Sequence, residues 1–138
     1  MADATFTVAS VKPLEGCIIR RFTVGADTLT PGMSVYVSAD NTVAKARGNA
    51  FAALLECIGM VVSNASGAVS FATGDTVDVV LFGPVTGGLA NIAGGSRFFV
   101  SNTAGGITQN ATGTKVCFFG IGLSTTTILV APAVISVA

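Results

Sequence analysis

The chain has 138 residues, of which 51% are hydrophobic and only 10% charged, and its seven basic side chains balance its seven acidic ones. That length suits a single domain large enough to bury a core of its own. Nucleic-acid binding and electrostatic attachment to a membrane both need clustered Lys and Arg, so this neutral, charge-poor chain is expected to bind neither.

The amino-acid pattern predicts β-strands along almost the whole chain, because runs rich in Val, Ile, Phe and Thr alternate with short turn segments. Residues typical of turns separate these runs, as at Pro31-Gly32 and Gly105-Gly106. In chain order, the expected strands are 5–11, 17–24, 34–38, 58–63, 76–82, 97–101, 116–123 and 126–130.

Three segments fall outside this simple strand pattern. Residues 1–15 form either an N-terminal arm or the first strand of the domain. Residues 47–56, RGNAFAALLE, have the Ala and Leu content of one short helix that Asn49 could cap, although a loop followed by a strand fits as well. Residues 128–138 are apolar but too few for a membrane helix, and they contain Pro132, so they predict a buried strand.

The stretch Gly32-Met-Ser-Val-Tyr-Val-Ser38 has a counterpart in Gly95-Ser-Arg-Phe-Phe-Val-Ser101. Later segments also match, Gly59-Met-Val-Val-Ser63 with Gly120-Ile-Gly-Leu-Ser124. The similarity predicts a single β domain, 16–138, with two similar halves at about 16–80 and 81–138. Such a repeat favours a compact mainly-β sandwich or barrel over an open sheet. Chance similarity between segments rich in Gly, Val and Ser is the alternative.

Charge is spread unevenly along the chain, since only Arg97 and Lys115 are charged after Asp78. A monomer with so much uncharged surface is prone to associate. The pattern indicates that partners cover much of the surface. A surface of neutral Ser, Thr, Asn and Gly is the alternative.

The chain offers little for catalysis, because it has no histidine to act as a general base or a metal ligand. Its three cysteines, Cys17, Cys57 and Cys117, are widely spaced among apolar neighbours. Buried structural thiols are therefore expected rather than a zinc or redox site. No catalytic residue, enzymatic activity or cofactor is expected.

Two pairs of like-charged residues lie close together in the sequence. Asp75 and Asp78 are close in sequence, with Asp75 expected in a turn and Asp78 at a solvent-facing strand position. Calcium would need more oxygen ligands nearby, so no metal site is expected. Arg20 and Arg21 are adjacent, and in a strand they point to opposite faces, which favours ordinary salt bridges over a basic patch.

Two pairs of adjacent aromatic residues, Phe98-Phe99 and Phe118-Phe119, lie within expected strands. One ring of each pair should point into the core and the other outward, unless the strand is covered on both faces. An outward Phe on a charge-poor strand can contact another subunit, so Phe98 and Phe99 are candidate contact residues.

The N-terminal stretch contains TFTV, which alternates like a strand and could add to the edge of a neighbour's sheet. In that case, Thr5, Phe6 and Val8 would contact a neighbouring subunit. An ordinary first strand of the domain itself is the alternative.

Low charge, the absence of histidine and a repeated strand pattern occur together in this chain. The pattern is a Gly-x-x-apolar-aromatic-Val-Ser strand with a polar turn after it, followed later by IGMVVSNASG or FGIGLSTTTILVAP. GDTVDVVLFGPV, a Gly-Asp turn that enters a strand ending in Gly, belongs to the same pattern. In composition and strand pattern, residues 16–138 resemble small bacteriophage head decoration proteins, also called capsid cement proteins.

The resemblance implies a β-sandwich or β-tulip-like domain that assembles as a homotrimer on the outer capsid surface of a virion. There it would bridge subunits of the major capsid protein, because the pressure of packaged DNA loads the seams between them. The first ten residues, MADATFTVAS, lack the basic and apolar regions of a signal peptide, which agrees with synthesis in the cytoplasm of a host bacterium.

Other functions fit the sequence less closely. A tail-fibre or receptor-binding head domain would present exposed aromatic and acidic groups at one tip, and this chain has few. A cysteine hydrolase would need a histidine beside its thiol. A small β-sandwich that carries a ligand would need a cavity, which only a structure can show.

Overall fold

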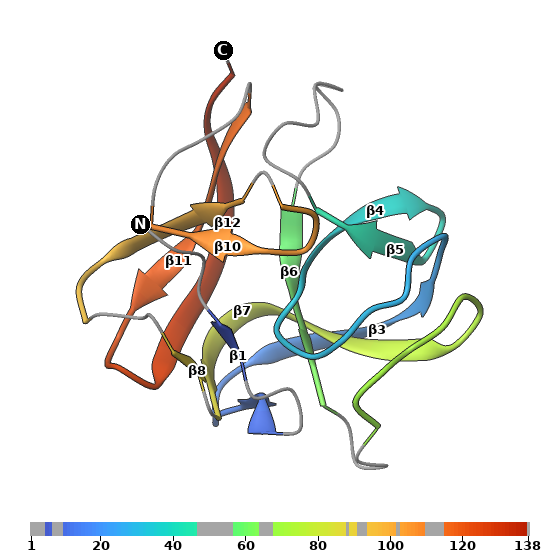
Figure 1. Ribbon diagram of the computed structural model, residues 1–138, viewed down its shortest axis with the longest axis horizontal. Helices are drawn as coiled ribbons and strands as arrows, with labels where there is room; N and C mark the ends of the chain where they lie inside the picture. Colours follow the sequence, from blue (N-terminus) through green and yellow to red (C-terminus); the bar gives the residue numbers. More distant parts are fainter. Residues whose placement is uncertain are drawn as a thin grey trace.

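β-Strands make up nearly all the regular structure of the chain. A computed structural model describes residues 5–6, 10–46, 57–63, 68–87, 89–90, 94–101, 103–109 and 115–137. Its strands, labelled in Figure 1, are β1 (Thr5–Phe6), β2 (Lys12–Pro13), β3 (Ile18–Val24), β4 (Ser34–Ala39), β5 (Thr42–Lys45), β6 (Cys57–Val62), β7 (Thr76–Thr86), β8 (Leu89–Ala90), β9 (Arg97–Val100), β10 (Ile107–Thr108), β11 (Lys115–Gly122) and β12 (Thr127–Val137).

Five strands close into a barrel in the order β3, β5, β4, β6 and β7, on the right of Figure 1. β3 and β5 are parallel, and the other neighbouring pairs are antiparallel. Because β7 pairs with both β3 and β6, the barrel has no free edge strand to template unwanted pairing.

The second part of β7 begins a further sheet in the order β7, β12, β11, β9 and β10. Gly83 marks the change, because residues 76–82 pair with β3 whereas residues 83–86 pair with β12. Its φ of +130° is a conformation open to glycine but strained for other residues. β2 also pairs with this part of β7, while β1 pairs with β8 in a separate ladder.

Two buried clusters hold these layers together. The barrel interior contains Phe22, Val24, Leu29, Val35, Val43, Val61, Phe71, Val77 and Val79. The second cluster, between the barrel wall and the further sheet, contains Val11, Ala46, Met60, Val62, Val80, Val85, Phe98, Val100, Ile107, Phe119, Ile128 and Val130. Each cluster stabilises the fold by removing apolar surface from water.

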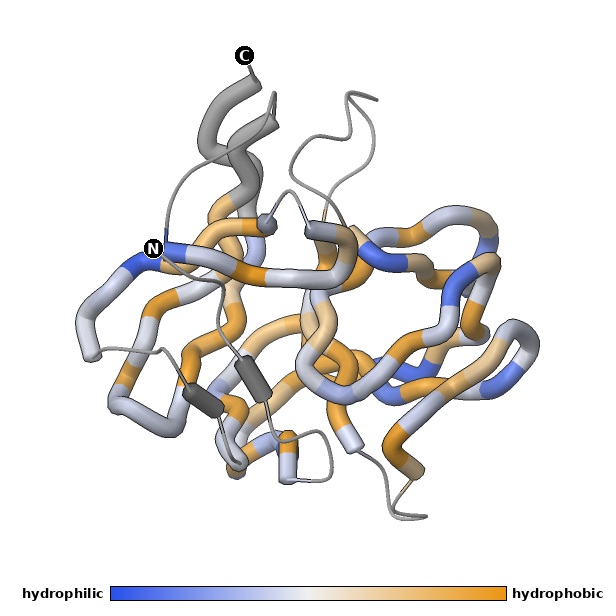
Figure 2. Tube along the Cα trace, in the orientation of Figure 1, coloured by the Kyte–Doolittle hydropathy of each residue, from blue (hydrophilic) through white to orange (hydrophobic). Residues whose placement is uncertain are grey.

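β6 and β7 contribute side chains to both clusters, because successive residues of a strand point to opposite faces. Val61 and Val79 belong to the barrel interior, whereas Met60 and Val80 belong to the second cluster. Coverage on both faces explains why these strands are hydrophobic over most of their length (Figure 2).

The segments that match in sequence also share a strand register. Val35 pairs with Gly59 in the barrel, and Phe98 pairs with Gly120 in the further sheet. These are matching positions of the repeated sequence. The similarity of the halves is therefore one of structure as well as of composition.

Backbone hydrogen bonds before each of these strands repeat as well. Gly32 N donates to Val61 O at 2.7 Å, and Gly95 N donates to Gly122 O at 2.6 Å. Both donors have positive φ, 99° for Gly32 and 81° for Gly95, which a glycine adopts without strain. The repeated glycine thus sets the chain direction at the start of β4 and of β9.

The expectation of a compact mainly-β fold is confirmed. Seven of the expected strands are present with similar bounds, although β7 continues further, to Thr86. β12 (Thr127–Val137) covers almost all of the strand expected over 128–138. The expected strand 5–11 was too long, since Ser10 and Val11 lie outside any strand. The sequence did not predict β2, β5, β8 and β10. The proposed helix at 47–56 lies outside the described residues.

Candidate functional site

One end of the barrel is closed by an apolar plug. Leu29 and Phe71 form a two-residue bridge in which each backbone N–H donates to the other's carbonyl, at 2.9 and 2.8 Å. Both side chains are buried and belong to the barrel cluster. This end therefore offers little surface to a ligand.

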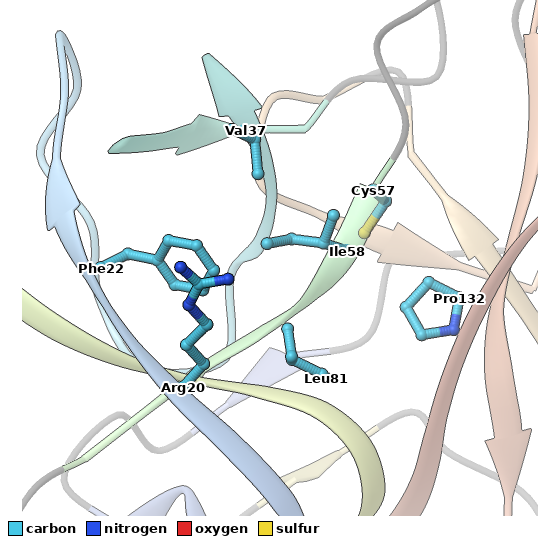
Figure 3. A pocket seen from close by; sticks show the side chains of 7 residues that line it. All are labelled: Arg20, Phe22, Val37, Cys57, Ile58, Leu81 and Pro132. Carbon is cyan, nitrogen blue, oxygen red and sulfur yellow. The ribbon is translucent and has the colours of Figure 1, made fainter. Parts of the chain in front are cut away.

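The opposite end of the barrel is open and forms a hollow of about 410 Å³, which we call the barrel mouth. Its lining residues, shown in Figure 3, are Arg20, Phe22, Val37, Cys57, Ile58, Leu81 and Pro132. The mouth continues the inward-facing rows of the barrel strands, since Val35 leads to Val37 and Val79 to Leu81.

Arg20 is the charged residue among those that line the mouth. Its guanidinium lies 5.1 Å from the centre of the Phe22 ring (Figure 3). It also donates a hydrogen bond of 2.7 Å to Asn41 Oδ1. A guanidinium over an aromatic face is attracted by the ring quadrupole. Arg20 thus lies at one side of the mouth, and the rest of the lining suits an apolar group.

The neighbouring arginine has a different role, as the sequence predicted for adjacent strand residues. Arg21 Nε lies 3.1 Å from Asp78 Oδ1, across the β3–β7 ladder. The 70% exposure of the arginine side chain makes this an ordinary surface ion pair. Asp75 lies in the turn before β7 and accepts a hydrogen bond from Ala72 N at 2.8 Å.

Phe98 and Phe99, the candidate contact residues, differ in exposure. Phe98 is fully buried in the second cluster and has no surface to offer a partner in this fold. Phe99 is half-buried and packs edge-to-face on Phe118, with ring centroids 6.2 Å apart. Of the two, only Phe99 can reach another subunit without rearrangement.

The N-terminal candidates lie within the chain's own pairing where the structure describes them. Thr5 pairs with Ala90 and Phe6 with Leu89, as β1 of the molecule itself. This is the arrangement of an ordinary first strand rather than of an arm that leaves the domain. Val8 lies outside the described residues.

The thiols are less deeply buried than the sequence predicted. Cys17 and Cys57 are half-buried, and the side chain of Cys117 lies outside the described part. Cys57 lines the barrel mouth, while the Cys17 thiol donates to Pro84 O at 3.0 Å. Both cysteines pack against the second cluster. Burial raises the pKa of Cys17, partly offset by a backbone hydrogen bond with Leu14.

Two pairs of large apolar side chains are exposed outside the mouth. Ile18 and Phe82 face each other across the β3–β7 ladder and are 59% and 48% exposed. Ile121 and Leu123, at the end of β11, are 37% and 52% exposed. Exposed apolar groups of this kind are typical of surfaces that a partner covers, and the sequence analysis did not predict their positions.

The described residues contain neither a metal-binding cluster nor a helix that could span a membrane. Within these ranges, no group of three or more His, Cys, Asp or Glu side chains could hold a metal ion. In the same part of the chain, no helix is long and apolar enough to cross a membrane. A scan against protein-family models found no match, and a search of curated proteins found none either.

Proposed function

We propose that the protein is a virion structural protein, a head decoration or cement protein that binds the outer capsid surface as an oligomer. The exposed apolar pair Ile18 and Phe82 carries this proposal. These residues lie on a charge-poor β scaffold. Burying them against another protein would stabilise the complex, and this stabilisation requires no reactive group.

The physical task of such a protein is to hold neighbouring capsid subunits together. Surface buried across a seam must be exposed again before the seam opens, so each bound copy raises the free energy needed for opening. The barrel suits this task because its closed ladder limits deformation. In this role the protein is not an enzyme, and its partners are the major capsid protein and copies of itself.

Binding to capsids that lack this protein tests the proposal. The wild-type protein should co-sediment with such capsids and raise the temperature at which they open. A variant with Ile18→Glu and Phe82→Glu should bind much more weakly, because two carboxylates would be buried. Val69→Glu is the matched control, since Val69 is 40% exposed and belongs to neither exposed apolar pair. Failure of the wild-type protein to bind would contradict the proposal.

The barrel mouth favours a second function, that of a small module that binds an apolar ligand. Its volume is within the range of ligand pockets, and apolar side chains line it together with Arg20. A hydrophobic fluorescent dye should then bind with one-to-one stoichiometry, and Leu81→Glu should abolish that binding. A tail-fibre or receptor-binding head domain, the other virion role considered, has no comparable support from the geometry.

A further inference from the structure

The repeated register allows each residue of the barrel wall to be matched with a residue of the second half. Gly59 and Gly120 are equivalent, and the residues that follow them match in order. Met60 therefore corresponds to Ile121, and Val62 to Leu123. Val80, which pairs with Met60, corresponds to Leu129, which pairs with Ile121. The two sets form the outward-facing wall of each half.

The two walls differ in what covers them. Met60, Val62 and Val80 are at most 1% exposed, because they pack in the second cluster against the further sheet. Ile121 and Leu123 are 37% and 52% exposed. We call Ile121, Leu123 and the half-buried Leu129 the outer patch. The outer patch keeps the apolar character of the covered wall without its cover.

The surface of the further sheet that covers the barrel wall also has a counterpart in the barrel. Phe119 and Val130 of the further sheet pack in one buried cluster with the barrel wall. Phe119 lies at a register shift beside Gly120, as Ile58 lies beside Gly59, so these two correspond. Val130 follows Leu129 and Leu81 follows Val80, so Val130 and Leu81 correspond as well.

The covering surface thus matches the barrel mouth. Val85 pairs with Ile128, as Arg20 pairs with Val79, so Val85 corresponds to Arg20. Val85 is fully buried. Its counterpart Arg20, together with Ile58 and Leu81, lines the open mouth. The surface that receives the wall within the chain is therefore repeated in the barrel, where it stands open.

We propose that the outer patch of one copy packs over the barrel mouth of a second copy, and so repeats between chains the contact that joins the two halves. The partner is a second copy of this chain. The two surfaces differ, so the contact is head-to-tail and makes a closed ring if the rotation closes. A trimer would place six similar halves in that ring. This proposal rests on the self-association part of the proposed function and needs no capsid.

Charge at the edge of the outer patch agrees with this arrangement. Arg97 pairs with Ile121 at the place where Ser34 pairs with Met60. Ser34 Oγ donates to Gly106 O at 3.2 Å, across the contact between the halves. Arg97 in turn is exposed and lies at the edge of the outer patch.

The group that Arg97 would meet follows from the same register. Val43 pairs with Val37 as Ile107 pairs with Val100, so Thr42 corresponds to Gly106. Thr42 follows a turn that carries the exposed Asp40. Docking would therefore bring Arg97 of one copy toward Asp40 of the next. Over the described ranges, the ion pair present is Arg21–Asp78, so neither Arg97 nor Asp40 is already engaged in one.

The molar mass in solution, measured by light scattering on a sizing column, tests the docking. The wild-type protein should form an oligomer of the 13.7 kDa chain, with three times that mass for a trimer. Leu123→Glu at the outer patch and Val37→Glu at the mouth should each give a monomer, and their side chains are exposed enough to leave the fold intact. Circular dichroism and thermal unfolding check that fold.

Mixing the two variants gives the sharpest result. Each variant keeps one intact surface, so an equimolar mixture should form a dimer and nothing larger. Val69→Glu should keep the wild-type mass. If both variants keep the wild-type mass, or if the mixture stays monomeric, the docking is wrong.

The charge pair gives an independent test. Arg97→Glu and Asp40→Arg should each weaken association, on the order of tenfold in Kd, and the double variant should recover most of the loss. Additive losses in the double variant would overturn the Arg97–Asp40 contact. A wild-type protein that stays monomeric up to millimolar concentration would overturn the docking itself. Binding of that monomer to capsids would still leave the proposed capsid role standing.

Discussion

Gly59 and Gly120 occupy the same place in the two halves, and at each of them the next strand approaches so closely that a side chain has no room. A Cβ atom on Gly59 would overlap Val80 O, and one on Gly120 would overlap Leu129 O. The lack of a side chain therefore sets the distance between β6 and β7 and between β11 and β12.

We expect Gly59→Ala and Gly120→Ala to lower the free energy of unfolding by about 1–3 kcal/mol or more, because backbone rather than a flexible side chain must move. Urea denaturation followed by circular dichroism measures the loss. Gly94→Ala is the control, since its Cβ would lie 3.4 Å from Leu123 O, an ordinary contact. Equal losses at all three positions would show that close approach is not the cause.

The two aromatic residues of β9 should differ in their contribution to stability. Phe98→Ala should cost about 3–5 kcal/mol, the range for a fully buried ring, because it leaves a cavity in the second cluster. Phe99→Ala should cost less, with about 0.5–1.5 kcal/mol from the edge-to-face contact with Phe118. Denaturant midpoints compare the two, and a larger loss for Phe99 would contradict the burial pattern.

The Arg21–Asp78 ion pair should add little to stability. A double-mutant cycle with Arg21→Ala and Asp78→Ala should give a coupling free energy of about 0.2–1 kcal/mol, since the arginine side chain is 70% exposed. Added salt at 1 M should reduce that coupling, because exposed charges are screened. A coupling that is unchanged by salt would mean that the pair acts through packing instead.

Cys17 should react slowly with iodoacetamide near neutral pH. Burial raises its pKa, and deprotonation would also lose the hydrogen bond from the thiol to Pro84 O. The thiolate is the reactive form, so alkylation should accelerate only as the pH rises past the ordinary value of about 8.5. Peptide mass spectrometry after timed alkylation, with and without urea, measures the alkylation rate of Cys17. The same rate in folded and unfolded protein would contradict the raised pKa.

The same shift predicts how stability changes with pH. The folded thiol holds its proton to a higher pH than the unfolded thiol does. Its contribution to stability is therefore complete below the unfolded pKa and is lost as the pH rises through the folded one. Cys17→Ser should flatten the fall in unfolding free energy at alkaline pH. A slope that is the same in both proteins would assign the fall to other groups.

Much of the fold could be predicted from the sequence, because long β-favouring runs and the repeated glycines are local signals. β5 (Thr42–Lys45) and β10 (Ile107–Thr108) were missed for a physical reason. They are only four and two residues long, too short to show an alternating pattern, and their pairing with β4 and β9 holds them in place. Such strands are set by the tertiary structure rather than by their own residues.

The candidate site could not be predicted in the same way. Arg20, Val37 and Leu81 belong to three separate strands, and only closure of the barrel brings them to one opening. The outer patch was closer to prediction, since the Gly59 and Gly120 segments were already matched in sequence. The sequence alone did not show that one wall is covered and the other is exposed.

β7 is shared by both halves, with one part in the barrel wall and the other in the further sheet. Neither half can lose this strand without removing a wall from the other. The boundary between the halves therefore differs from a linker between domains, because it cannot be cut without opening both cores. Unfolding should accordingly proceed as a single cooperative transition, even though the chain carries two copies of one plan.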